Sequence, residues 1–258
     1  MRTSALITSY IQAVIFGALG IRCINSWLRD RDTRSGHLAI AAGLFGLQSA
    51  ISAVQSSIYN SSAIPPETPP RWIGIVTSIL LFIAVYAFLL FLLDFITLPQ
   101  GLSTGVQVFL ILATLFNIVL SIIERPDLKF DPQKGIVDIP GVDNPISYRA
   151  YIGYVLIYLA IAFGFLAVAF LVYGARTSGL ARFRMISIGS GFFLFFVVIG
   201  LLPRLLFGNP SAQTIRNLIN VLQYVALLVA PLLFVGFSPP KLIRDRFGGA
   251  ELPSAAGR

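Results

Sequence analysis

The chain has 258 residues, of which 56% are hydrophobic and 12% are charged, and its mean hydropathy is +0.83. Soluble domains carry about twice this charged fraction, so the composition excludes a water-soluble fold and indicates a polytopic membrane protein. The net charge of +8 comes from short loops between apolar stretches, which argues against a nucleic-acid partner. The only cysteine, Cys23, and the only histidine, His37, exclude an intramolecular disulfide and a multi-histidine metal site. We therefore expect no metal and no cofactor.

Seven apolar stretches recur along the chain, each long enough to cross about 30 Å of hydrocarbon as a helix. Their apolar runs are continuous, which predicts helices. The predicted spans are residues 5–27, 37–58, 72–98, 104–124, 149–175, 184–207 and 214–237. The first is too long for a signal-peptide core and is expected to be retained. We predict an all-α integral membrane protein, with a seven-transmembrane helix bundle over residues 1–247 and a flexible cytoplasmic tail at 248–258.

Basic residues distinguish the two predicted sides of the membrane. One side has eleven: Arg22, Arg29, Arg31, Arg34, Arg176, Arg182, Arg184, Lys241, Arg244, Arg246 and Arg258. The other side has eight: Arg2, Arg71, Arg125, Lys129, Lys134, Arg149, Arg204 and Arg216. Because Lys and Arg close to spans favour the cytoplasmic side, we predict a multi-pass protein of the cell membrane with its N-terminus outside and its C-terminus in the cytosol.

The second predicted span is rich in small residues. They recur every three or four positions: Ala39, Ala42, Gly46, Ser49, Ala53 and Ser56. Such a stripe lets other helices approach closely, so we expect this span to lie at the centre of the bundle. The third span, residues 72–98, is rich in Leu and Phe and is expected to face lipid along part of its length.

Two loops on the predicted outer side have distinctive sequences. Residues 59–71 contain two Pro-Pro pairs, which predict a stiff, extended connection. Within residues 125–148, segments 128–131 and 136–139 flank the connection Pro132-Gln133-Lys134-Gly135. Proline early and glycine late in this connection favour a small β-hairpin over the outer mouth of the bundle. An irregular loop without a ligand role is the alternative.

Three charged residues of the predicted spans lie near the cytoplasmic face. Asp94 is the only carboxylate well inside a span, and Arg22 and Arg184 lie near the same face. Because charges in hydrocarbon are costly unless paired, we predict an ion pair between Asp94 and these arginines. Such a pair either clips helix ends together or acts as a latch that breaks on activation. His37, at a predicted helix start, is expected to be an interfacial polar residue.

A second polar set falls in the outer half of the predicted helices. Its members are Gln12, Gln55, Asn117, Tyr154, Tyr158, Arg204, Asn217, Asn220 and Tyr224. The spacing of Asn217, Asn220 and Tyr224 places these three on one helical face. If the set converges, it forms an outward cavity that binds a small anionic or amphipathic ligand through Arg204. Interhelical hydrogen bonds and interfacial anchoring are the alternative account.

Several chemistries are absent from the sequence. The three lysines, Lys129, Lys134 and Lys241, lie outside the spans, which excludes a retinal Schiff base in the last helix. The third span lacks the acidic-arginine end of G-protein-coupled receptors, and the seventh lacks their Asn-Pro-x-x-Tyr pattern. The chain has no phosphate-binding loop, catalytic triad or intramembrane histidine cluster. We expect no enzymatic activity and no catalytic residue.

Two segments on the predicted cytoplasmic side carry a resemblance to a known family. They are Gly179-Leu180-Ala181-Arg182-Phe183-Arg184-Met185 and Gly236-Phe237-Ser238-Pro239-Pro240-Lys241-Leu242-Ile243-Arg244. Together with seven spans and an outer N-terminus, they resemble the seven-helix N-terminal sensor regions of bacterial, especially actinobacterial, membrane histidine kinases and related signalling proteins. In that family the Phe-x-Pro-Pro segment leads into a cytoplasmic output domain. Here it leads to residues 248–258, so we expect no output domain and no kinase activity in this chain alone.

These features support one main hypothesis, a non-catalytic sensor that binds a small extracellular ligand and signals through a cytoplasmic or membrane partner. The second hypothesis is a structural or assembly subunit of a membrane complex. The third is a small-molecule transporter, with Asp94 as its sole candidate ion-binding carboxylate and no evident inverted repeat. The sensor predicts an outward cavity lined by Arg204 and Asn217, whereas the subunit predicts that side chains fill this space.

Overall fold

The protein is seen in a computed structural model that describes residues 2–31, 33–61, 71–96, 99–124, 130–131, 136–137, 146–207, 225 and 227–247. Six helices in these residues are long and apolar enough to cross a membrane. They are α1 (Arg2–Asp30), α2 (Thr33–Ser61), α3 (Arg71–Leu93), α4 (Gln100–Glu124), α5 (Ile146–Arg176) and α6 (Gly179–Phe207). A shorter apolar helix, Leu227–Phe237, precedes the six-residue helix α8 (Lys241–Arg246). The prediction of a multi-pass helical membrane bundle is confirmed.

The predicted seventh span is described only in part. Of residues 214–237, the structure describes residue 225 and the helix Leu227–Phe237, so a count of seven spans stays a prediction. The predicted tail, residues 248–258, lies outside the described residues. In the predicted loop 59–71, α2 continues to Ser61 and α3 begins at Arg71, and residues 62–70 lie outside the described part.

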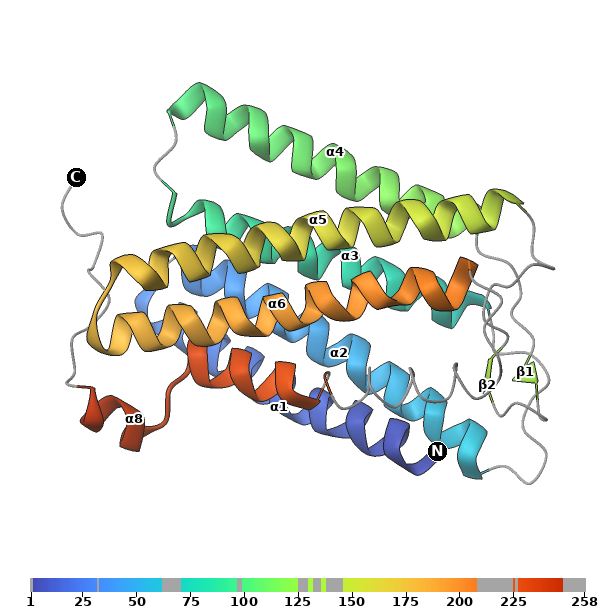
Figure 1. Ribbon diagram of the computed structural model, residues 1–258, viewed down its shortest axis with the longest axis horizontal. Helices are drawn as coiled ribbons and strands as arrows, with labels where there is room; N and C mark the ends of the chain where they lie inside the picture. Colours follow the sequence, from blue (N-terminus) through green and yellow to red (C-terminus); the bar gives the residue numbers. More distant parts are fainter. Residues whose placement is uncertain are drawn as a thin grey trace.

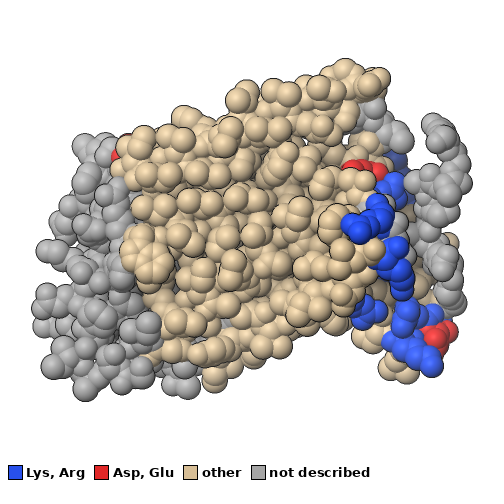
Figure 2. All heavy atoms as spheres, turned by 180° about the vertical axis from the view of Figure 1, so that it is seen from behind, with Lys and Arg blue, Asp and Glu red and all other residues tan. Residues whose placement is uncertain are grey.

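Consecutive long helices run in opposite directions along one common axis (Figure 1). The α1–α2, α3–α4 and α5–α6 connections lie at the same end as α8, which we call the α8 end. All basic residues with described side chains gather there (Figure 2): Arg22, Arg29, Arg31, Arg34, Arg176, Arg182, Arg184, Lys241, Arg244 and Arg246. These are the residues predicted for the cytoplasmic side. The basic residues predicted for the other side lie outside the described side chains, so the orientation itself stays a prediction.

Helices α1 and α2 pack closely because both carry glycine at their contact. A Cβ atom added to Gly46 of α2 would lie 2.8 Å from the backbone nitrogen of Gly17 in α1. A Cβ atom added to Gly20 would lie 3.0 Å from Cα of Gly43. The predicted small-residue stripe on α2 is therefore confirmed as a surface of close helix approach, and its described members Ala39, Ala42, Gly46, Ser49 and Ala53 are buried.

Helix α3 packs against several other helices of the bundle, and so does α2, whose Phe45 contacts rings of α1, α3 and α6. Phe88 of α3 contacts Phe45 of α2 and Phe192 of α6, with ring centroids 5.7 and 5.2 Å apart. One turn on, Phe91 contacts Phe170 of α5 and Phe237. The Phe-rich half of α3 thus packs on other phenylalanines rather than on lipid. Among the described side chains, α4 has the smallest buried share of the six long helices, and it lies at the edge of the bundle in Figure 1.

Helix α3 ends earlier than predicted, at Leu93 instead of residue 98. The backbone N–H groups of Phe95 and Ile96 bond the carbonyls three residues back, a tightening typical of a helix end. Asp94 therefore lies in the turn after the helix rather than inside it. The predicted hairpin is confirmed as an antiparallel pair of two-residue strands, β1 (Phe130–Asp131) and β2 (Ile136–Val137), with Phe130 opposite Val137.

Candidate functional site

Polar side chains join α4 to α5 in the half of the bundle away from α8. The buried residues of α4 are all polar, and their spacing places Thr114, Asn117 and Ser121 on one face. The hydroxyl of Ser121 lies 2.7 Å from the hydroxyl of Tyr151, and Nδ2 of Asn117 donates to the hydroxyl of Tyr154 over 3.5 Å. We call Asn117, Ser121, Tyr151 and Tyr154 the α4–α5 seam. The Ser121–Tyr151 bond is a hydrogen bond between helices of the kind that the predicted alternative requires, whereas Asn117 Nδ2 also donates to the Ala113 carbonyl of its own helix and Asn117 Oδ1 is buried without a partner among the described residues.

An apolar groove of about 640 Å³ lies beside the seam, between α3, α4 and α5. Tyr154 and Tyr158 are among its lining residues, together with Phe109, Phe116 and Phe165. In hydrocarbon such a surface matches lipid tails or another apolar helix. Among the described residues, the predicted outer site contains a hydrogen-bonded seam with an apolar groove beside it, and a polar cavity around Arg204 stays a prediction.

The remaining members of the predicted outer set do not join the seam. Gln12 on α1 and Gln55 on α2 are half-buried and lie on the α1–α2 pair, across the bundle from α4 (Figure 1). Arg204 belongs to α6, but its side chain lies outside the described residues. Asn217, Asn220 and Tyr224 also lie outside the described residues. The structure thus brings together Asn117, Tyr154 and Tyr158 and leaves the convergence of the rest a prediction.

Asp94 pairs with His37, and not with Arg22 or Arg184 as predicted. Nδ1 of His37, in the second turn of α2, lies 2.8 Å from Oδ2 of Asp94, a hydrogen bond in which the imidazole donates. The prediction was wrong because α3 ends one residue before Asp94, which turns the carboxylate toward the start of α2. The same turn is held from two further sides, since Arg34 lies over the Phe95 ring and the Tyr173 hydroxyl donates to the Phe95 carbonyl.

Arg184 instead joins α6 to the end of the helix Leu227–Phe237. Its Nε donates to the carbonyl of Gly236 over 3.1 Å, and its Nη2 donates to the carbonyl of Phe237 over 3.2 Å. Carbonyls in the last turn of a helix have no partner within the helix and carry partial negative charge, so a guanidinium suits them. Phe183 and Phe247 stack nearby with centroids 5.3 Å apart. We call Phe183, Arg184, Gly236, Phe237 and Phe247 the α6–α8 junction.

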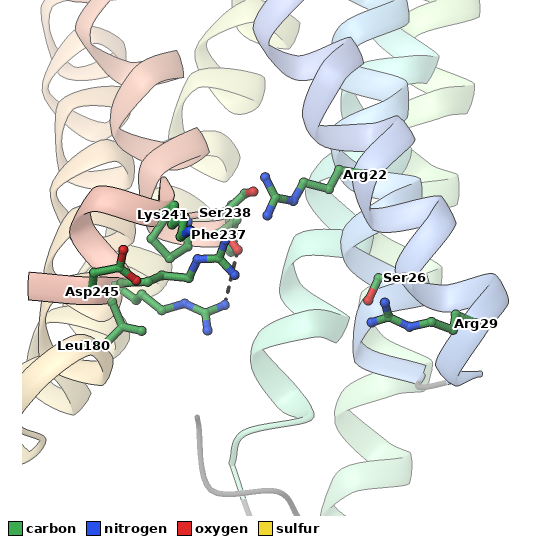
Figure 3. Close-up of a pocket in the computed structure, with 11 residues that line it drawn as sticks. Arg22, Ser26, Arg29, Leu180, Phe237, Ser238, Lys241 and Asp245 are labelled. Carbon is green, nitrogen blue, oxygen red and sulfur yellow. Dashed lines mark hydrogen bonds between the residues drawn. The ribbon is translucent and has the colours of Figure 1, made fainter. Parts of the chain in front are cut away.

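A cavity of about 680 Å³ adjoins this junction. Figure 3 shows Arg22 extending from α1 across the cavity toward Ser238, while Lys241 and Asp245 lie on the α8 side. The cationic residues that line it are Arg22, Arg29, Arg184, Lys241 and Arg244. Arg22 thus belongs to this cavity, which we call the basal cavity.

Sequence reasoning missed two features of this end of the molecule. His37 is a partner of Asp94, and the signal that could have found it is that both are polar residues at the same predicted membrane face. Lys241 and Arg244 were assigned to topology alone, although they line a cavity with Arg22. The two segments that carry the family resemblance contain Arg184, Gly236 and Phe237, but no contact between the two segments was predicted from the sequence.

Among the described residues, no three His, Cys, Asp or Glu side chains converge on a point that could hold a metal ion. In comparisons with known proteins, no family model matches the chain, and no curated protein sequence gives a significant match.

Proposed function

We propose that the protein is a non-catalytic sensor of the cell membrane, with its N-terminus outside, which responds to a small extracellular ligand and signals through a separate partner at the α8 end. The observation that supports this function is the pair of hydrogen bonds from Arg184 to the Gly236 and Phe237 carbonyls. They connect a helix that crosses the whole bundle to the segment that leads into α8. A sensor needs such a connection between its two membrane faces.

The contact between α6 and this segment leaves little room for independent movement. A Cβ atom added to Gly236 would lie 2.6 Å from Cγ1 of Ile188 and 3.1 Å from the Arg184 carbonyl. Phe237 in turn contacts Phe88 and Phe91 of α3. Because packed contacts of this kind move as a unit, a displacement of α6 at the outer end would reach α8. The proposed ligand site is the outer polar set around Arg204.

A second candidate function is an assembly subunit of a membrane complex. The observation that favours it is the α4–α5 seam, where the outer polar groups bond one another across two helices. Helix α4 also has an apolar groove along one side and mostly exposed apolar side chains, which another membrane helix could cover. In this function the polar residues hold the bundle together and carry no signal.

Deletion of the gene in the native host, followed by complementation, separates the two functions. For a sensor, deletion changes a set of transcripts, wild type restores them, and Arg184→Ala fails to restore them although it reaches the membrane in equal amount. Arg182→Ala, a neighbour of the same charge that is not part of the junction, is the matched control and should restore them.

Native gel electrophoresis of the same membranes gives the opposing outcome. Loss of one large membrane complex on deletion, with full rescue by Arg184→Ala, would contradict the sensor and support the assembly subunit. Equal rescue of the transcripts by both variants would also contradict transmission through the α6–α8 junction.

A further inference from the structure

The basal cavity has an excess of positive charge. Five cationic residues line it, Arg22 and Arg29 from α1, Arg184 from α6, and Lys241 and Arg244 from α8, against one carboxylate, that of Asp245. Like charges around one space repel each other, and the effect strengthens as water is excluded. An anion in the cavity would therefore stabilise the arrangement of its walls.

Several polar groups of the cavity have no partner in the described part of the protein. No ion pair or hydrogen bond engages the side chains of Arg22, Lys241 or Arg244 there. Ser238, which is only 5% exposed, also lines the cavity, and its buried hydroxyl lacks a hydrogen-bond partner. A buried hydroxyl without a partner is unfavourable and uncommon. Arg31 and Arg34 differ, because each lies over an aromatic ring.

The position of the cavity indicates which anion fits. Arg22 belongs to the candidate membrane span Tyr10–Arg29, about two turns before its end, which would place the start of the cavity near the hydrocarbon boundary. Its other walls include the apolar side chains of Leu180, Phe237 and Pro239. A basic pocket between helix ends at this depth meets the phosphate level of the lipid headgroups. Arginine donors on opposite walls suit the several oxygens of a phosphate.

We propose that the basal cavity binds a phosphate group, carried by the headgroup of an anionic lipid or by a free phosphate compound. In this site, Arg22 from α1 and Lys241 and Arg244 from α8 contact the phosphate oxygens. The Ser238 hydroxyl donates a further hydrogen bond to the phosphate. The bound phosphate joins α1 to α8, which otherwise meet only across the cavity. This site is separate from the outer ligand site and does not depend on the sensor function.

Binding can be measured on the full chain in a mild detergent through the thermal unfolding midpoint and by titration. The probes are short-chain phosphatidylglycerol, short-chain phosphatidylcholine, inorganic phosphate and sulfate. We expect phosphatidylglycerol to raise the unfolding temperature and phosphatidylcholine to raise it much less, because its choline opposes the cationic walls. Arg22→Gln and Lys241→Gln should each weaken phosphatidylglycerol binding about tenfold, the loss of one charge-assisted hydrogen bond. Ser238→Ala should weaken it less.

Arg182→Gln is the matched control, since it removes one positive charge from the same end of the molecule but not from the cavity wall. It should leave the affinity unchanged. Equal weakening by Arg182→Gln and Arg22→Gln would overturn the proposal, because diffuse attraction to a basic surface would then explain binding. Absence of any shift with all four probes would also overturn it. A shift with inorganic phosphate as large as with phosphatidylglycerol, lost in Arg22→Gln, would support the site with a free phosphate compound as its source.

Each variant is first compared with wild type without any probe. An unchanged unfolding midpoint and gel-filtration profile show that the fold is intact. If Arg22→Gln does not fold, Arg244→Gln on the exposed helix α8 tests the same wall, with the same tenfold expectation.

Discussion

Arg184 is placed where a single side chain can decide how α8 is attached. Its two bonds end on carbonyls that a helix leaves unpaired, and a Cβ atom added to Gly236 would lie 3.1 Å from the Arg184 backbone carbonyl, so the two helices are in close contact there. An aliphatic residue at position 184 would preserve the helix but leave both carbonyls without this donor. Loss of the Arg184 guanidinium should therefore loosen the attachment of α8 to α6.

Replacing Arg184 by Ala should lower the free energy of unfolding by about 2 kcal/mol, because two charge-assisted bonds to the Gly236 and Phe237 carbonyls are lost. Chemical unfolding in mixed micelles measures this change. A spin label at Leu242, which is 81% exposed on α8, should at the same time become more mobile. Arg182→Ala is the control; an equal loss in both variants would show that the charge, and not the junction, is responsible.

The pair His37–Asp94 fixes the turn between α3 and α4 against α2. Asp94→Ala removes the acceptor and leaves the imidazole without its partner, so we expect a loss of about 1 kcal/mol in unfolding free energy. His37→Ala should cost a similar amount, and the double variant should cost little more than either single one, since both remove the same bond. Fully additive losses would contradict a direct interaction between these two side chains.

At the scale of elements, the contacts of α2 explain why glycine positions that look alike in the sequence are not equivalent. Gly46 faces the α1 backbone directly, whereas a Cβ atom added to Gly43 meets nothing within 4 Å. Small residues therefore mark a face that can approach another helix closely, but only the structure shows which of them is in contact.

Gly46→Ala should destabilise the protein, because its Cβ atom would lie 2.8 Å from the Gly17 nitrogen and the two helices would have to move apart. We expect a loss of about 2 kcal/mol, within the range for overpacked contacts. Gly43→Ala should be neutral or stabilising by up to about 1 kcal/mol, because alanine favours the helix and has space. Thermal unfolding of the two variants side by side measures the difference, and a larger loss in Gly43→Ala would contradict the contact.

The α4–α5 seam is the second contact between elements that can be measured alone. Ser121→Ala and Tyr151→Phe each remove one hydroxyl of a buried pair that lies 2.7 Å apart. A double-mutant cycle should give a coupling energy of about 0.6 kcal/mol, the average for hydrogen bonds between membrane helices. The cycle Ser121→Ala with Tyr158→Phe is the matched control and should give a coupling close to zero. Coupling in the control alone would contradict the geometry of the seam.

For the whole molecule, the sequence predicted the helical membrane bundle, six of its helices, the hairpin in the loop after α4 and the close face of α2. These features follow from hydropathy, turn residues and residue size, which act locally. The partners of Arg184 could not be predicted, because they depend on which helices become neighbours, and for Asp94 the one available signal was that His37 lies at the same predicted membrane face. The packing of α3 on other phenylalanines was missed for a related reason, since Leu and Phe serve equally well against lipid and against other phenylalanines. The outer ligand set centred on Arg204 stays a prediction.

The orientation of the bundle is the prediction at this scale that can be tested most directly. Leu242 on α8 and Trp72 at the start of α3 lie at opposite ends of the bundle, and both side chains are largely exposed. In a Cys23→Ala background, Trp72→Cys should react with a membrane-impermeant maleimide on intact cells, whereas Leu242→Cys should react only after permeabilisation. The physical reason is the excess of basic residues in the sequence, eleven on the α8 side against eight on the other, because Lys and Arg near spans favour the cytosolic side. The reverse labelling would place α8 outside and remove the basis for a cytoplasmic signalling partner, while the packing of the helices would stand unchanged.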